Sequence, residues 1–138
     1  MQTCGARIVT SSTGILDTSG TASSLGSNPN CSWIIMSDDP SKHITLTISY
    51  LLITNRPIVK NGDCEASNRV DIHEGMDESG PLIGRYCESF IPLPITTRGS
   101  AMFIHLVSPY NYYHGWFSAT YSVLSSCKCN THNSKYCG

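Results

Sequence analysis

Charged residues are scarce in this sequence, and their charges nearly cancel. Asp, Glu, Lys and Arg make up 14% of the 138 residues, and the formal net charge is -1 at pH 7. Binding to nucleic acid or to an anionic membrane by electrostatic attraction requires a basic excess, so we expect neither partner. No apolar run approaches the roughly 18 residues that cross a bilayer, so we expect no membrane insertion by this segment.

The motifs of common hydrolases are also missing. Neither GxSxG nor HExxH occurs, so no nucleophile elbow or zinc-protease helix is indicated. His73 lies between Asp71 and Glu74, and His105 lies in another alternating segment. We interpret both histidines as residues of solvated strand faces. We therefore predict that the chain is no enzyme, with no catalytic residue and no cofactor, and a secreted hydrolase is the weakest alternative.

Cysteine, in contrast, is abundant. Seven cysteines in a chain of this length are typical of a disulfide framework in a secreted protein or an ectodomain. The first residues, MQTCGARIV, lack the basic start and apolar core of a signal peptide, so we expect the signal to lie outside this sequence. Zinc is the alternative use of Cys127, Cys129, His132 and Cys137, but zinc sites favour C-x₂₋₄-C over C-x-C spacing. We predict no metal.

Short segments of alternating apolar and polar residues, separated by turn-forming residues, run through the chain. They cover residues 31–36, 43–50, 70–73, 82–86, 101–108 and 117–123. Such a pattern without helical periodicity predicts an all-β antiparallel sandwich. In residues 43–50 the alternation places Tyr50 toward the core, and in residues 101–108 it places Phe103 and His105 outward.

The stretch from Val70 to Cys87 is predicted to be a hairpin on which the other segments pack. Its sequence, VDIHEGMDESGPLIGRYC, gives a strand, a loop without an apolar run, and a second strand after Pro81. A bond between Cys64 and Cys87 would staple this hairpin across its base.

Seven motifs follow one another in the order of a CUB domain, which the chain resembles over residues 4–123. They are Cys4-Gly5, SNPNCSWII, ITLTISY, VDIHEG, GRYC, MFIHLVS and FSATY. The resemblance implies a β-sandwich of jelly-roll type. It also implies two disulfide bridges, Cys4–Cys31 and Cys64–Cys87.

Many CUB domains bind one Ca²⁺ through three acidic side chains, and Ca²⁺ prefers several hard, anionic oxygen ligands. Here the three positions fall on Ile53 or Thr54, on Asn68 or Ser67, and on Pro109. None of these residues carries a carboxylate. We therefore predict a module without calcium-dependent binding.

The last residues, 127–138, resemble the start of a laminin-type EGF-like repeat that is cut short. The resemblance implies a Cys127–Cys137 bridge and a partner for Cys129 beyond residue 138. A CUB domain followed by such a repeat is similar in order to the attractins, which are mosaic extracellular proteins, so we expect neighbouring EGF-like modules.

A cluster of aromatic residues is the strongest candidate for a binding site. Tyr and Trp are favoured anchors at interfaces because they give large contact area at a small entropic cost. The alternative is that some of them cap the core. We predict recognition of an extracellular protein or glycan, with a structural spacer in a mosaic receptor as the alternative. The predicted binding residues are Tyr110, Tyr112, Tyr113, His114 and Trp116.

One sequon is present. Asn30-Cys31-Ser32 fits the N-glycosylation pattern, so Asn30 is the predicted glycosylation site.

Overall fold

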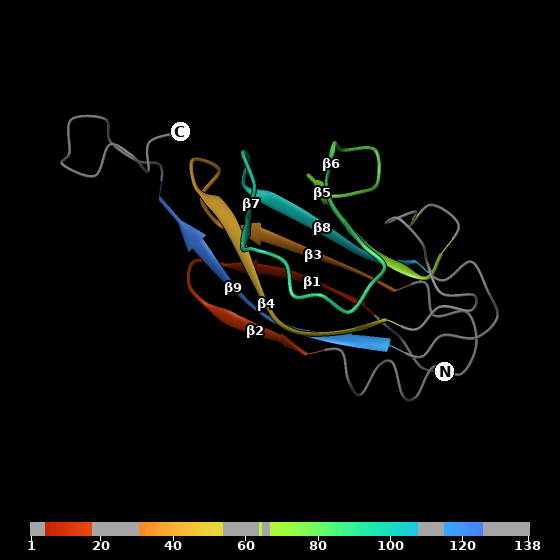
Figure 1. Cartoon of the computed structure of the whole chain (residues 1–138). Coiled ribbons are helices and arrows are strands. Elements are labelled where there is room, and N and C mark those ends of the chain that lie inside the picture. Colours follow the sequence, from red (N-terminus) through yellow and green to blue (C-terminus); the bar gives the residue numbers. More distant parts are fainter. Residues whose placement is uncertain (1–4, 18–30, 54–63, 65–66, 108–114, 126–138) are drawn as a thin grey trace.

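The computed structural model describes residues 5–17, 31–53, 64, 67–107 and 115–125, and these residues form strands, turns and loops (Figure 1). Within this described part there is no helix that could cross a membrane. The strands are β1 (Gly5–Thr10), β2 (Gly14–Asp17), β3 (Cys31–Ser37), β4 (His43–Ile53), β5 (Arg69–Glu74), β6 (Leu82–Tyr86), β7 (Ile95–Thr96), β8 (Ala101–Val107) and β9 (Gly115–Leu124).

The strands form two sheets that pack face to face. Sheet A has the order β1-β3-β8-β5-β6, and sheet B has the order β2-β9-β4-β7. Every described pairing is antiparallel except that of β1 with β3, which is parallel. The predicted all-β sandwich is confirmed. The sequence did not predict β1 and β2, because residues 5–17 hold too few apolar side chains to show an alternation.

The core lies between the inner faces of the two sheets. Alternate residues of the central strands are buried there, as the pleat of a half-buried strand requires. Trp33 and Phe117 meet edge to face with ring centroids 5.7 Å apart, a favourable arrangement for aromatic rings. Each fully buried side chain of this size contributes roughly 1.5–3 kcal/mol. The wholly buried members include Ile35, Ile44, Leu46, Ile72, Met102, Ile104, Leu106 and Phe117.

The prediction that Tyr50 faces the core was wrong. β4 alternates as expected up to Ile48, but the register with β9 shifts between Ile48 and Tyr50. A bulge of this kind adds one residue to one strand and reverses the face of every residue that follows. Tyr50 is therefore 42% exposed, whereas Leu51 and Ile53 are buried.

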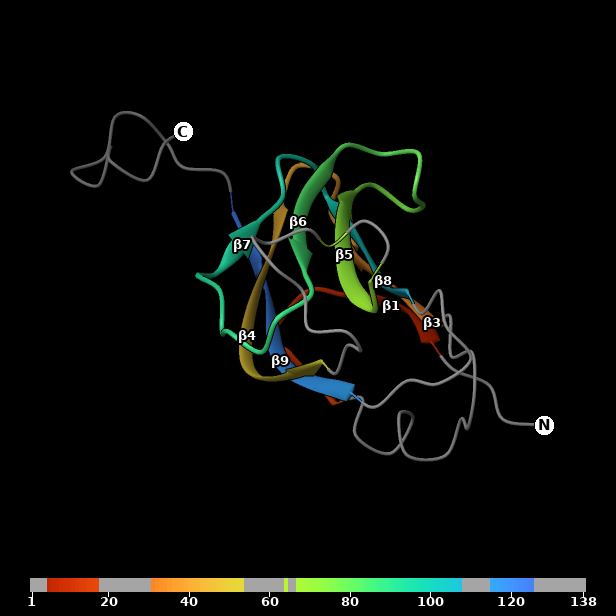
Figure 2. The same cartoon turned by 45° about the vertical axis from the view of Figure 1, so that its right-hand side comes forward.

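The hairpin of β5 and β6 forms as predicted, but it does not occupy the centre of the fold. β6 is an edge strand of sheet A, and β8 lies in the middle between β3 and β5. Figure 1 shows the hairpin toward one side of the two sheets, and Figure 2 shows β5 and β6 lying side by side. The connecting loop is fixed by glycines: Gly75 has a φ of +91°, and a Cβ at Gly80 would lie 1.7 Å from the Glu74 carbonyl oxygen. A larger residue at position 80 cannot fit without moving the backbone.

Candidate functional site

One end of the sandwich gathers the points at which the chain leaves the sheets. Cys31 begins β3, Ile53 ends β4, Arg69 begins β5, Val107 ends β8 and Gly115 begins β9. Strand pairing brings these ends together, because Arg69 lies opposite Val107 and Ile53 lies opposite Gly115. We call this the loop end. Loops at the end of a rigid sandwich are where such folds commonly carry binding residues.

The predicted aromatic site attaches to the loop end. Tyr110, Tyr112, Tyr113 and His114 lie outside the residues that the structure describes. Trp116 belongs to β9, where its backbone is paired opposite Leu52 of β4. The position of β9 thus places the last residue of the predicted site at the loop end, and its binding role stays a prediction.

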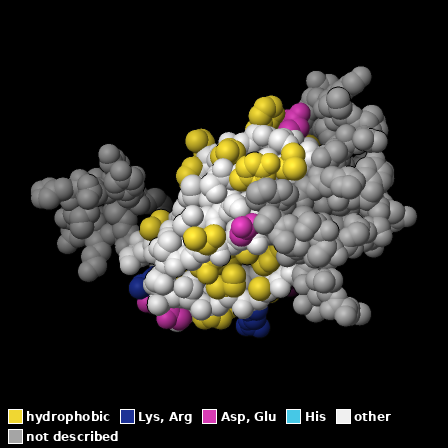
Figure 3. Space-filling model, turned by 90° about the horizontal axis from the view of Figure 1, so that it is seen from below, with side chains coloured by type: hydrophobic (Ala, Val, Ile, Leu, Met, Phe, Trp, Pro, Cys, Tyr) yellow, Lys and Arg dark blue, Asp and Glu magenta, His cyan; other side chains and the backbone are white. Residues whose placement is uncertain are grey.

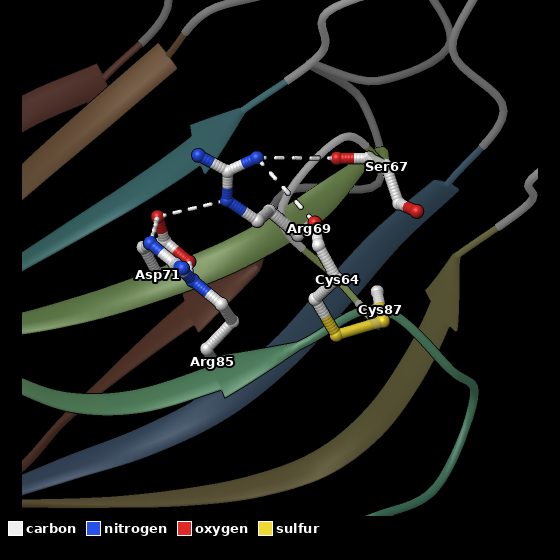
Figure 4. Close-up of a disulfide and its surroundings, with 6 residues drawn as sticks. All are labelled: Cys64, Ser67, Arg69, Asp71, Arg85 and Cys87. Carbon is white, nitrogen blue, oxygen red and sulfur yellow. Dashed lines mark hydrogen bonds and ion pairs between the residues drawn. A yellow bond between two sulfur atoms is a disulfide. The ribbon is translucent and has the colours of Figure 1, made fainter. Parts of the chain in front are cut away.

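The Cys64–Cys87 disulfide is confirmed, and it also lies at the loop end (Figure 4). Its two Cα atoms are 5.4 Å apart, within the range that a disulfide spans. Cys31 is disulfide-bonded as well. The other predicted cysteine partners, Cys4, Cys127 and Cys137, and the sequon residue Asn30 lie outside the described residues.

Beside the disulfide, one aspartate binds two arginines (Figure 4). Arg85 donates from Nε to Asp71 Oδ1 at 2.8 Å and from Nη2 to Oδ2 at 3.0 Å. Arg69 donates from Nε to Asp71 Oδ2 at 3.0 Å. The Asp71 side chain is only 5% exposed. A carboxylate this deeply buried needs such charged donors to remain ionised.

The pKa of Asp71 results from two opposing causes. Burial raises the pKa, but the hydrogen bonds from Arg85 and Arg69 outweigh burial and hold the pKa below its usual value. Asp71 is therefore ionised near neutral pH.

Arg69 also connects the network to the disulfide. Its Nη1 donates to the carbonyl oxygens of Cys64 and Ser67, each at 3.5 Å, and the Ser67 amide donates to the Cys64 carbonyl at 3.0 Å. The covalent bridge and the ion pairs thus hold the same corner of the loop end. Sequence reasoning missed this network, although the spacing of Arg69 and Asp71 places both on one face of β5.

Of the expected calcium positions, the structure describes Ile53, Ser67 and Asn68. Ile53 has a buried hydrocarbon side chain, and Asn68 is an uncharged amide with no exposed surface. Among the residues that the structure describes, no three His, Cys, Asp or Glu side chains group in a way that could hold a metal.

The two strand histidines lie on the outer face of sheet A, which is turned away from sheet B, but the prediction of a solvated face was wrong for His73. His73 is buried, and its Nδ1–H donates to the Gly80 carbonyl at 2.9 Å, because the loop after β5 folds back over the sheet. Phe103 is buried between His73 and His105, with ring centroids 6.0 and 5.7 Å away.

His105 is more open, at 23% exposure, and its Nδ1 lies 3.9 Å from Glu78 Oε2. Burial lowers the pKa of His105, and the nearby carboxylates of Glu78 and Asp71 only partly oppose this. His105 is therefore neutral at pH 7. The ring contacts of both histidines with Phe103 are packing contacts on this outer face.

Comparison with known proteins agrees with this architecture. The family model described as CUB domain matches residues 4–121. The chain is 36% identical over 128 residues to pig (Sus scrofa) cubilin, covering 93% of this chain and 3% of cubilin. It is 30% identical over 124 residues to zebrafish (Danio rerio) neuropilin-1a, covering 89% of this chain and 13% of that protein. The chain thus spans a small part of the curated relatives that it matches.

A solved structure shows the same fold. The MASP-1 CUB2 domain bound to Ca²⁺ superposes with a TM-score of 0.61 at 19% identity, covering 86% of this chain and 97% of that one. The residues, the two-sheet topology and the disulfide define a disulfide-bonded β-sandwich module. More narrowly, the chain belongs to the CUB domain family.

Proposed function

We propose that this CUB domain is an extracellular recognition module that binds a protein or glycan through the aromatic segment at the loop end, without catalysis. The match to the CUB family over residues 4–121 carries this proposal. Its disulfide-bonded cysteines, Cys31, Cys64 and Cys87, support an oxidising, extracellular location. The bridge and the ion pairs around Asp71 support the site, because they hold the base of the loops rigid and so reduce the entropy lost on binding.

Replacing Trp116 and Tyr112 by alanine is expected to weaken binding to such a partner by more than tenfold. Truncating an aromatic anchor at the centre of an interface commonly costs more than the roughly 1.4 kcal/mol that a tenfold change represents. A partner would first be identified on an array of extracellular ectodomains and glycans. Affinity would then be measured by surface plasmon resonance, with unfolding temperature measured in parallel.

Tyr50→Ala is the matched control, since Tyr50 is an exposed aromatic residue of β4 outside the aromatic segment. Its affinity should equal that of the wild type. Unchanged affinity in the Trp116→Ala and Tyr112→Ala double variant would refute the aromatic site. A domain that binds nothing on the array, while the parent protein keeps every interaction without it, would favour the spacer function instead.

We further propose that recognition by this domain does not depend on calcium. Ile53 and Asn68 offer no carboxylate at the family's calcium positions. The unfolding temperature is therefore expected to be the same in excess CaCl₂ and in EDTA, because a ligand stabilises a fold only to the extent that it binds. The MASP-1 CUB2 domain, which has been solved with Ca²⁺ bound, serves as the positive control. A clear rise in unfolding temperature with CaCl₂ would contradict this proposal.

A further inference from the structure

Two carboxylates and two histidines gather on the outer face of sheet A. On the part of the surface described in Figure 3, charged side chains are few. In contrast, Asp77 and Glu78 are adjacent in the loop that joins β5 to β6, and His73 and His105 lie on the strands over which this loop folds. Histidines that meet carboxylates in this way can make the position of a loop depend on pH.

The base of the loop, residues 75–81, is fixed by backbone hydrogen bonds. The Glu74 amide donates to the Pro81 carbonyl at 2.9 Å, and the Gly75 amide donates to the carbonyl of Ala101 in β8 at 3.0 Å. Figure 2 shows this loop at the top of the hairpin of β5 and β6. Because these bonds join backbone groups, a change of pH leaves the base in place.

The tip of the loop is a turn organised by Asp77. The Ser79 amide donates to Asp77 Oδ1 at 2.9 Å, the Ser79 hydroxyl donates to the same oxygen, and the Gly80 amide donates to the Asp77 carbonyl at 3.3 Å. The hydrogen bonds from Ser79 lower the pKa of Asp77, so the turn keeps its carboxylate in mildly acidic solution. Glu78 lies within this turn, with its Oε2 3.9 Å from His105 Nδ1.

His105 is the group of sheet A that faces the tip. In the sheet it lies opposite Ser32 of β3 and Asp71 of β5. Asp71 is held by Arg69 and Arg85 and has a lowered pKa, and guanidinium groups do not titrate in this range. These neighbours therefore keep their charges while a histidine titrates.

His73 lies on the other side of the Phe103 ring from His105. Its bond to the Gly80 carbonyl uses Nδ1–H, which the charged imidazolium has as well as one neutral tautomer. Proton uptake by His73 therefore leaves this bond intact. The contact that proton uptake changes is that between Glu78 and His105, which is an ion pair only when His105 is charged.

We propose that Glu78 and His105 form an acid-closed latch, in which proton uptake by His105 ties the tip of the loop to the middle strand of sheet A. The imidazolium attracts a carboxylate at this distance, whereas the neutral ring does not. Coupling is reciprocal, so whatever Glu78 adds to the proton affinity of His105, the proton adds to the hold on Glu78. Burial lowers the pKa of His105, and the carboxylates of Glu78 and Asp71 only partly oppose this. The latch therefore closes at pH values below the ordinary histidine pKa of 6.5.

NMR titration of the full chain from about pH 7.5 to about pH 5 tests the latch. Glu78→Gln removes the carboxylate from a side chain that is 73% exposed, so the fold should be kept, and the pKa of His105 should fall relative to the wild type. Solvent exchange of the amides of residues 77–79, corrected for its intrinsic pH dependence, is the second measurement. In the wild type these amides should be protected roughly two- to fivefold more when His105 is charged, as the strength of an exposed ion pair implies.

Asp38→Asn is the matched control, because Asp38 is an exposed acid in the turn after β3 and should change neither measurement. His105→Gln should abolish the pH dependence of the protection. Equal pKa values of His105 in the wild type and in Glu78→Gln would overturn the proposal, as would protection that does not rise in acid. A rise that persists in Glu78→Gln would also overturn it and would assign the effect to His73. None of these outcomes bears on the aromatic segment at the loop end.

Discussion

Alanine in place of Asp71 is expected to lower the free energy of unfolding by roughly 3–5 kcal/mol, the usual cost of breaking a buried ion pair. The loss is large because Asp71 is nearly inaccessible and accepts hydrogen bonds from two guanidinium groups, and the substitution removes all of these charged contacts. Urea denaturation with constant m-value measures the change. Asp38→Ala is the control, because Asp38 is exposed and should change stability by less than about 0.5 kcal/mol.

The same network predicts a pH dependence. The pKa of Asp71 in the folded protein lies below its ordinary value of 3.8. The ionised Asp71 therefore stabilises the fold to its full extent at pH values above 3.8. The stabilisation is lost as pH falls from 3.8 through the lower pKa of the folded state. The Asp71→Ala variant should lack this part of the acid transition. An acid profile parallel to that of the wild type would mean that the ion pairs contribute little to folding.

Removing the Cys64–Cys87 bond is the second change for which we expect a large effect. It should lower the free energy of unfolding by about 3 kcal/mol. The bond closes a loop with a sequence separation of 23, and constraint of the unfolded chain by a loop of that length accounts for this magnitude. The Cys64→Ala and Cys87→Ala double variant would be compared with the wild type by chemical denaturation under non-reducing conditions.

The two single variants provide the control. Either one breaks the bond, so each should lose nearly as much stability as the double variant, and the losses should be far from additive. Losses that sum to that of the double variant would show that the two cysteines act as independent packing residues. In that case the rigidity of the loop end would depend mainly on Asp71 and its arginines.

The sequence predicted the sandwich well where a strand has one buried and one more open face. The alternation of β3, and of β4 up to Ile48, reports this difference directly. In a short outer strand such as β2 the apolar residues do not alternate with polar ones. Ile15 and Leu16 are adjacent, and Leu16 is buried whereas Ile15 is 77% exposed. The sequence of this segment therefore did not indicate a strand. The order of the strands, including the edge position of β6, depends on pairings between distant segments that no local pattern encodes.

The candidate site was predictable only in part. Cysteines stand out in a sequence, so the Cys64–Cys87 disulfide could be predicted, whereas the binding role of the aromatic segment stays a prediction. The network around Asp71 required knowing that Arg85, in the following strand, lies directly opposite it. The burial of His73 depends on a loop that folds back over the outer face of sheet A, and the loop's own sequence gives no sign of that direction.

The extra residue in β4 has a consequence for how this domain can vary in length. After the bulge between Ile48 and Tyr50, Leu51 and Ile53 point into the core only because the alternation has been offset by one position. Deleting Ser49, the unpaired residue, would remove the bulge: Tyr50 would then follow Ile48 as the outward residue, and Leu51 and Ile53 would still face the core. A one-residue deletion should therefore be tolerated at Ser49, whereas the same deletion between Ile44 and Ile48 would turn the residues on one side of it to the wrong face.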